Sequence, residues 1–122
     1  MKMKTIKVGI MSVKQYKQRT LDIAIGIYKP KKNEPKIWFE SVKSMAQILS
    51  NENQDLLKVI LDKQPQSLKE LEMLTGRAKS NLSRTLKTLE RYGIVKLHKQ
   101  NNTLVPEVKA THFQVEFGLD AA

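Results

Sequence analysis

The amino-acid sequence predicts an α+β fold, and three observations lead to this prediction. Short stretches of alternating apolar and polar residues lie near both ends of the chain, at 5–10 and 112–119. Between 41 and 92, apolar side chains recur at the three- and four-residue spacing of amphipathic helices. Two further alternating stretches, 94–99 and 103–105, flank a short polar turn, which is typical of a β-hairpin.

Length and composition bound the possible classes of protein. A chain of 122 residues fits one domain with a small appendage. We expect residues 1–36 to form a basic arm for dimerisation or partner contact, and residues 37–122 to form the main domain. The absence of cysteine excludes disulfides and thiolate metal sites. No apolar run approaches the ~20 residues of a membrane span, and the N-terminus does not resemble a signal peptide, so we expect a cytoplasmic protein without membrane contacts.

The positive charge is strong and unevenly distributed. The chain has 22 basic and 12 acidic residues, a net charge of +10. Residues 1–36 carry ten basic and two acidic residues (+8), and residues 77–99 carry seven and one (+6), whereas 37–76 and 100–122 each have a net charge of −2. A basic but inert surface is one interpretation, and attraction of nucleic acid is the other. The concentration of charge in two blocks favours nucleic acid.

The N-terminal region predicts a strand and a helix that need a packing partner. Thr5–Ile10 alternates as a half-buried strand, and Ser12 can cap a helix that runs to about Ile25. We expect its apolar stripe to pack inward and its polar residues to face water. The stripe comprises Val13, Tyr16, Thr20, Ile23 and Ala24, and the polar set comprises Lys14, Lys17, Gln18 and Arg19.

A loop and an aromatic segment follow this helix. Tyr28–Lys36 has the prolines, Asn and charges of a loop. The next segment, Ile37–Trp38–Phe39, is interpreted either as a core anchor before a helix or as a hot spot for partner binding.

Three helices are predicted in the middle of the chain. The first spans Ser41–Leu49, with Val42, Met45, Ala46 and Leu49 on its apolar stripe. The second begins after Ser50, is apolar around much of its circumference, and stops at Pro65. Ser67 and Glu70 form a capping box that starts the third helix, and Gly76 ends it. Its inward stripe comprises Leu68, Leu71 and, at the last position, Leu74 or Thr75.

A fourth helix, Lys79 to about Tyr92, follows within a few residues of Gly76. Two short helices with a glycine-containing turn of this length indicate a helix-turn-helix, and the hairpin that follows resembles a wing. At ~100° per residue, Leu82, Thr85, Leu86 and Leu89 face the core. The outward face has no acidic residue; it comprises Arg77, Ser80, Arg84, Lys87 and Arg91, flanked by Asn81 and Ser83.

The outward face favours contact with DNA over a simple solvated face, because it lacks the Glu–Lys pairs of ordinary surface helices. Asn81 suits adenine, Arg84 can bridge guanine O6 and N7, and Arg91 is placed for phosphates. The hairpin adds basic and small polar residues that suit phosphates or the minor groove. The candidate DNA-binding residues are therefore Arg77, Lys79, Ser80, Asn81, Ser83, Arg84, Lys87, Arg91, Lys96, Lys99, Asn101 and Asn102.

The last predicted strand, about His112 to Leu119, places Phe113, Val115 and Phe117 inward. It is expected to pair with the N-terminal strand, either within the chain or across a dimer. No enzyme is predicted: the sequence has no catalytic constellation, no metal-ligand spacing and no cofactor motif. Of the two histidines, His98 is interpreted as an exposed hairpin residue and not as a general acid or base.

Two runs, KIWFESVKSMAQILSNENQDLL and PQSLKELEMLTGRAKSNLSRTLKTLERYGIVKL, resemble a family of small prokaryotic winged helix-turn-helix proteins of the MarR/ArsR-like type. The resemblance covers most of Tyr28–Leu97, and TGRAKSNLSRTLKTLERYG is its most specific part. This family includes transcriptional regulators and antitoxins encoded beside TumE-type toxins. The resemblance implies a dimeric repressor, which in a toxin–antitoxin pair would repress its own operon and bind a cognate toxin.

The expected function is that of a sequence-specific, double-stranded DNA-binding repressor that acts as a homodimer on a near-palindromic operator. The alternative is a protein-interaction module on the same scaffold, whose positive charge engages an acidic partner without DNA. Structured RNA is a weaker third interpretation, because a helix of this kind suits the wide groove of B-form DNA.

Overall fold

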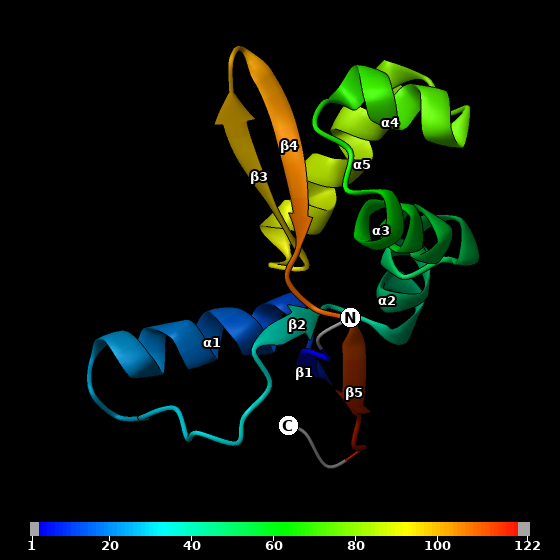
Figure 1. Cartoon of the computed structure of the whole chain (residues 1–122). Helices are drawn as coiled ribbons and strands as arrows, with labels where there is room; N and C mark the ends of the chain where they lie inside the picture. The colour runs from blue at the N-terminus through cyan, green and yellow to red at the C-terminus, as the bar shows by residue number, and fades with distance from the viewer. Residues whose placement is uncertain (1–2, 120–122) are drawn as a thin grey trace.

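The computed structural model describes residues 3–119 and has an α+β architecture (Figure 1). Residues 1–2 of the predicted arm and residues 120–122 of the predicted main domain lie outside the described residues. In chain order the elements are β1 (Thr5–Ile10), α1 (Val13–Ala24), β2 (Ile37–Phe39), α2 (Val42–Ile48), α3 (Asn51–Lys63), α4 (Leu68–Thr75), α5 (Lys79–Arg91), β3 (Val95–Gln100), β4 (Thr103–Val108) and β5 (His112–Glu116).

One sheet joins the two ends of the described chain. Its strand order is β2-β1-β5, and β1 pairs in parallel with both neighbours. The register sets Val8 beside Ile37 and Ile6 beside Phe113. The predicted pairing of the first and last strands is therefore confirmed within the chain. The aromatic segment 37–39 is a strand, which the sequence analysis did not predict, and α1 is the crossover between β1 and β2.

The second sheet is the hairpin of β3 and β4. Asn101 and Asn102 form its two-residue turn, with φ of 49° and 63°. Asn tolerates this left-handed conformation, which suits the twist of a two-residue hairpin. The returning strand is longer than predicted, because it continues through Pro106 to Val108. In Figure 1 the hairpin runs alongside α5, and β3 and α5 are in contact.

The hydrophobic core lies where the helices meet both sheets. Leu82, Leu86 and Leu89 of α5 are completely buried, as are Leu71 of α4 and Phe39 of β2. These side chains belong to one continuous cluster of buried residues. The ring of Phe39 stacks on that of Tyr92, with centroids 4.7 Å apart. This contact connects β2 of the parallel sheet to the end of α5.

The predicted serine caps at Ser12, Ser50 and Ser67 are confirmed, and Ser41, which was predicted as the first residue of its helix, is a cap as well. The hydroxyl oxygens of Ser12, Ser41, Ser50 and Ser67 each accept a backbone hydrogen bond at the start of α1, α2, α3 and α4. The capping box at Ser67 is only partly as predicted, because the Glu70 carboxylate accepts from the N–H of Gln66, at 3.3 Å. Gly76, with φ of 74°, ends α4 as predicted.

Helix α1 packs only partly as predicted: Ile23 is the one residue of the predicted stripe that is half-buried, whereas Lys14, Lys17 and Gln18 are exposed as predicted. Its half-buried residues are mostly polar (Gln15, Arg19, Asp22 and Ile23), and no residue of α1 is fully buried. Val13, Tyr16 and Leu21 are exposed, as are Thr20 and Ala24. Figure 1 shows the reason: α1 projects away from the helices of the core, with the returning loop alongside it.

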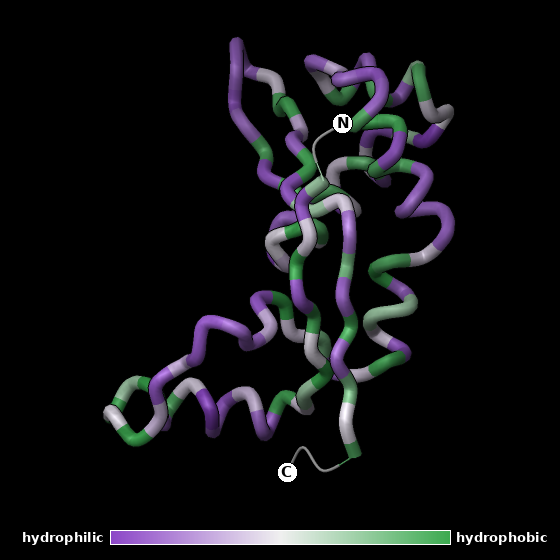
Figure 2. The backbone as a smooth tube through the Cα atoms, turned by 60° about the horizontal axis from the view of Figure 1, so that its bottom comes forward, coloured by the Kyte–Doolittle hydropathy of each residue, from purple (hydrophilic) through white to green (hydrophobic). Residues whose placement is uncertain are grey.

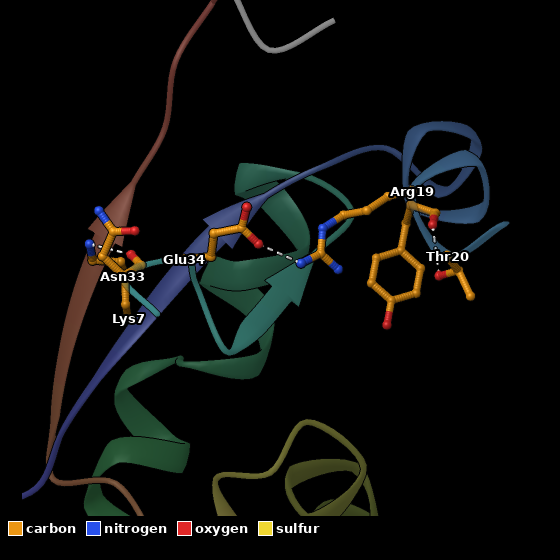
Figure 3. A network of polar contacts seen from close by, with 6 residues as sticks. Lys7, Arg19, Thr20, Asn33 and Glu34 are labelled. Carbon is orange, nitrogen blue, oxygen red and sulfur yellow. Dashed lines mark hydrogen bonds and ion pairs between the residues drawn. The ribbon is translucent and has the colours of Figure 1, made fainter. Parts of the chain in front are cut away.

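Arg19 holds this loop against α1 and is not the solvent-facing residue that was predicted. Its Nη2 lies 2.7 Å from Oε2 of Glu34 (Figure 3). Its guanidinium lies over the ring of Trp38, 5.2 Å from the centroid. Lys7 Nζ donates to the carbonyl oxygen of Asn33, at 2.7 Å. We call residues 12–36 the α1 arm; Figure 2 shows hydrophobic positions at its outer end.

Two other predicted apolar stripes are confirmed in part. In α2, Met45 and Leu49 pack against the core, but Val42 and Ala46 are exposed. In α4, Leu68 and Leu71 are buried, and of the two residues predicted for the last position Thr75 is half-buried and Leu74 is exposed.

The last strand was also predicted too long. β5 ends at Glu116, and only Phe113 packs against the core. Val115 is 46% exposed and Phe117 is 57% exposed, because in the described chain no element covers this end of the sheet.

Candidate nucleic-acid interface

The turn between α4 and α5 positions the candidate interface. After Gly76, the N–H of Arg77 donates to the hydroxyl of Thr75, at 3.2 Å. Ala78 stands at the cap position of α5 and has no side chain to serve as a cap. The Glu72 carboxylate of α4 does so instead, accepting from the N–H of Lys79 at 3.0 Å. A carboxylate at a helix N-terminus is also favoured by the helix dipole, so α4 fixes where α5 begins.

Helix α5 has a buried apolar face and an exposed basic one. Its three leucines are completely buried, whereas Ser80, Arg84, Lys87 and Arg91 are exposed as predicted. These residues line one shallow surface depression; its lining is Ser80, Ser83, Arg84, Lys87, Thr88 and Arg91. We call these six residues the basic face. It contains no acidic side chain, so nothing in it neutralises the three cations.

Glu90 is the one acidic residue of α5, and its carboxylate is engaged elsewhere. It accepts a hydrogen bond from the N–H of Leu97 in β3, at 2.8 Å. The single negative charge of the helix thus joins α5 to the hairpin and does not line the basic face.

Arg77 does not belong to the exposed face, which corrects its predicted position. It lies before the first residue of α5, and its side chain folds back along the helix. Nε donates to Oδ1 of Asn81 at 2.9 Å, and Nη2 donates to Oγ1 of Thr85 at 3.0 Å. The Asn81 side chain is thereby turned toward Arg77. Arg77 and Asn81 were both predicted to contact DNA, but in this structure their side chains bond to each other.

The remaining predicted residues lie at the two ends of the interface. Lys79 is exposed at the start of α5, and Ser83 is half-buried within the depression. Lys96, Lys99, Asn101 and Asn102 are all exposed on the hairpin. Because side chains alternate along a strand, Lys96 and Lys99 lie on opposite faces of β3. They cannot both contact the same stretch of backbone phosphates.

The outer face of the hairpin carries a charge cluster that the sequence analysis did not identify. Nε2 of His98 lies 2.7 Å from Oε1 of Glu107, and Nζ of Lys109 lies 3.7 Å from Oε2 of the same carboxylate. The hydrogen bond from His98, followed by the charge of Lys109, lowers the pKa of Glu107. Lys96 stands directly opposite Glu107 in the register. The predicted DNA contact Lys96 therefore has the carboxylate of Glu107 as its cross-strand neighbour.

Thr88 is the residue of the basic face that sequence reasoning missed. It follows Arg84 by one helical turn, and its hydroxyl donates to the carbonyl of Arg84 at 3.1 Å. The same helical arithmetic places Thr88 240° from Leu82, on the border of the outward face. The spacing of Thr88 from Leu82 was therefore the signal in the sequence that could have placed it on this face.

The family model of HVO_A0114 matches residues 48–115, more than half of the chain. The chain belongs to the HVO_A0114 family. No curated protein and no solved structure matches it. The HVO_A0114 match extends from the end of α2 to Val115 in β5, so it includes the whole candidate interface. The α1 arm lies outside the matched residues.

Proposed function

We propose that this member of the HVO_A0114 family is a winged helix-turn-helix, sequence-specific DNA-binding regulator that acts as a dimer. The observation that carries the proposal is the basic face of α5, whose three cations have no acidic neighbour in the depression. Behind it, the buried leucines hold the helix rigidly against the core. In this proposal α4 and α5 form the helix-turn-helix, and β3–β4 forms the wing.

The residues of the interface have different roles in the proposed complex. Ser80 and Arg84 are near enough to the start of α5 to contact base edges in the major groove, and Arg84 can bridge guanine O6 and N7. Lys87 and Arg91, further along the helix, contact phosphates. Asn101 and Asn102 at the hairpin tip approach the adjacent minor groove. Arg77 acts through Asn81 and Thr85 as a positioning residue.

A two-fold dimer supplies specificity by presenting two α5 helices about 34–36 Å apart, on successive turns of the duplex. The operator is then a near-palindrome, and repression follows from occupation of a promoter. The resemblance to antitoxins paired with TumE-type toxins suggests the promoter of the protein's own operon. The proposed setting is the cytoplasm; within residues 3–119, no helix has the length and apolar character needed to cross a membrane.

Fluorescence anisotropy with duplexes from the upstream intergenic region, together with selection from random duplexes, tests this function. We expect the wild type to select a near-palindrome and to lose affinity as salt increases, with log K falling by about 0.9 per phosphate contact for each decade of salt. Arg84→Ala should weaken binding by about 1–3 kcal/mol and relax preference at one base of each half-site.

The control is Lys63→Ala, because Lys63 is an exposed α3 residue whose Nζ lies 3.7 Å from Asp62 Oδ2, outside the basic face. This variant should bind like the wild type. An unchanged sequence preference in Arg84→Ala, or equal losses in both variants, contradicts the proposed reading role of α5.

A second candidate function is favoured by the exposed apolar residues of the α1 arm. Val13, Tyr16, Leu21, Ile25 and Ile27 are each at least 44% exposed. The arm carries seven basic and two acidic residues, so it suits an acidic protein partner with an apolar patch, such as a cognate toxin. Absence of any duplex binding at low salt, together with capture of the adjacent gene's product and loss of that capture in Leu21→Lys, favours this candidate.

A further inference from the structure

Strand β5 lies at the edge of its sheet, and one side of it is unpaired in the described chain. It pairs with β1 on one side, and in the described chain no strand pairs with its other side. The N–H of His112 donates to the carbonyl of Lys4, toward β1. Backbone groups alternate between the two sides of a strand. The N–H and C=O groups of Phe113 and Val115 therefore point toward the free edge, and a strand continued past Glu116 would direct those of Phe117 the same way.

The side chains of the same three residues form an incompletely covered apolar row. By register Phe113 and Val115 share the face of the sheet that carries Ile6 and Val8, and Phe117 directly follows the strand. Phe113 packs against the core, but Val115 is 46% exposed and Phe117 is 57% exposed. Beside Phe113 lies a depression of about 420 Å³ whose lining includes Leu57 and Leu61. An apolar side chain that arrived at this edge would find a site next to Phe113.

Natural proteins protect exposed sheet edges with lysine, proline or bulges. The segment 112–119 has no lysine, arginine or proline, and Glu116 is its only acidic residue. It also lies in the part of the chain with a net charge of −2, while the whole chain has +10 and residues 1–36 have +8. Repulsion between two copies is therefore weaker at β5 than at the α1 arm. The segment 37–76 has the same net charge of −2, but its edge strand β2 has only three residues, against five in β5. Charge and strand length together favour β5 as the place where two copies meet.

We propose that two copies pair antiparallel through β5 about a two-fold axis at Val115, forming one six-stranded sheet. The outward-pointing groups of 113, 115 and 117 are symmetric about Val115, so this register makes each a hydrogen-bonded pair. Val115 meets its own copy, and Phe117 of the second copy lies opposite Phe113, beside the depression. On the other face, Gln114 stands opposite Glu116 of the second copy, so no like charges are opposed.

This dimer does not require DNA, because every group that forms it lies outside the basic face. Dimer formation can therefore be measured separately from DNA binding. It also leaves the α1 arm free. The proposal gives the dimer of the proposed regulator a defined interface.

Light scattering behind size-exclusion chromatography, without DNA, tests the interface. We expect the wild type at about 100 μM to have twice the 14.0 kDa chain mass. Val115→Pro should run as a monomer, because proline removes the N–H at the axis while the N–H groups that pair with β1 remain. Leu21→Lys, on the α1 arm, is the matched control and should stay dimeric. A monomeric wild type, a dimeric Val115→Pro or a monomeric Leu21→Lys overturns the proposal.

Cross-linking supplies a second readout that does not depend on the proline variant folding. The chain has no cysteine, so single cysteines report only on their own position. Residues in a hydrogen-bonded antiparallel pair have Cα atoms about 5.5 Å apart, within disulfide range. Mild oxidation should therefore join Val115→Cys into a covalent dimer in most of the sample, and leave Phe117→Cys and Leu21→Cys monomeric under denaturing conditions. Efficient cross-linking of Leu21→Cys, or none of Val115→Cys, overturns the β5 interface.

Discussion

The guanidinium of Arg77 donates from Nε to Oδ1 of Asn81, at 2.9 Å. Nη2 donates to Thr85, and Nη1 is buried without a hydrogen-bond partner in the protein. Arg77, two residues before the start of α5, is thereby joined by hydrogen bonds to the first two turns of that helix. A cation used in this way cannot also reach a phosphate without breaking these bonds. Arg77 therefore joins the turn after α4 to the proposed reading helix.

Arg77→Ala should lower the free energy of unfolding by about 1–2 kcal/mol. The substitution removes two hydrogen bonds from a charged donor, whose value of ~1.5–3 kcal/mol each is reduced here because the site is only partly buried. Urea titration followed by circular dichroism measures the change. Asn81→Ala combined with Arg77→Ala should cost less than the sum of the single changes, because both remove the same bond.

Arg84→Ala is the matched substitution on the basic face, and it should change stability by no more than about 0.5 kcal/mol, as for other exposed side chains. Arg84 is exposed at the surface depression, with no ion pair in the described structure. If instead Arg77→Ala is fully stable and Arg84→Ala is not, the two roles have been assigned the wrong way round.

Gly9→Ala should destabilise the parallel sheet by about 1–3 kcal/mol, as expected when a packed site is overfilled. A Cβ at this position would lie 2.5 Å from Cζ3 of Trp38 and 2.9 Å from Cγ of Pro35. Trp38 is the only tryptophan, so its fluorescence should also shift. In a Trp38→Ala background the cost of Gly9→Ala should fall. An equal cost in both backgrounds would place the strain elsewhere.

The sequence was sufficient wherever structure depends on neighbours within a few residues. Serine caps, the glycine at the end of α4 and the leucine spacing of α5 predicted those helices within one or two residues. The same spacing identified Arg84 and Lys87 as exposed. These features follow from local hydrogen bonding and helical periodicity, which the order of residues specifies directly.

Features that depend on distant parts of the chain were missed. Periodicity gave α1 an inward apolar stripe, but nothing local shows that the core lies elsewhere and that Arg19 instead pairs with Glu34. Alternation likewise predicted Phe117 to face inward, although no described element covers it. Strand β2 has three residues, too few for a pattern, and is a strand because β1 lies beside it.

Glu72→Ala should destabilise the protein by about 0.5–2 kcal/mol, the usual value of a lost helix cap. Within the described residues the carboxylate supplies the side-chain acceptor at the start of α5, since Ala78 offers none. Ala78→Ser should restore most of the loss in the Glu72→Ala variant, because the extended backbone at 78 is that of an ordinary cap residue. Thermal unfolding of the two single variants and the double variant measures this. A double variant no more stable than Glu72→Ala alone would contradict the capping role.

The hairpin should lose stability in acid through Glu107. Its pKa is lowered in the folded protein, chiefly by the hydrogen bond with His98 and then by the charge of Lys109. A lowered pKa means that the folded state holds the proton less tightly than the unfolded state. The stabilisation is therefore complete above the ordinary pKa of glutamate, about 4.3, and is lost progressively as pH falls below it.

Glu107→Gln removes the titrating group and should flatten this part of the profile, whereas Glu116→Gln, on β5, should leave it unchanged. NMR of the amide groups of β3 and β4 between pH 3 and 6, a range chosen as about 1.5 units on either side of that value, measures the hairpin directly. An acid transition of the hairpin that persists unchanged in Glu107→Gln contradicts the assignment.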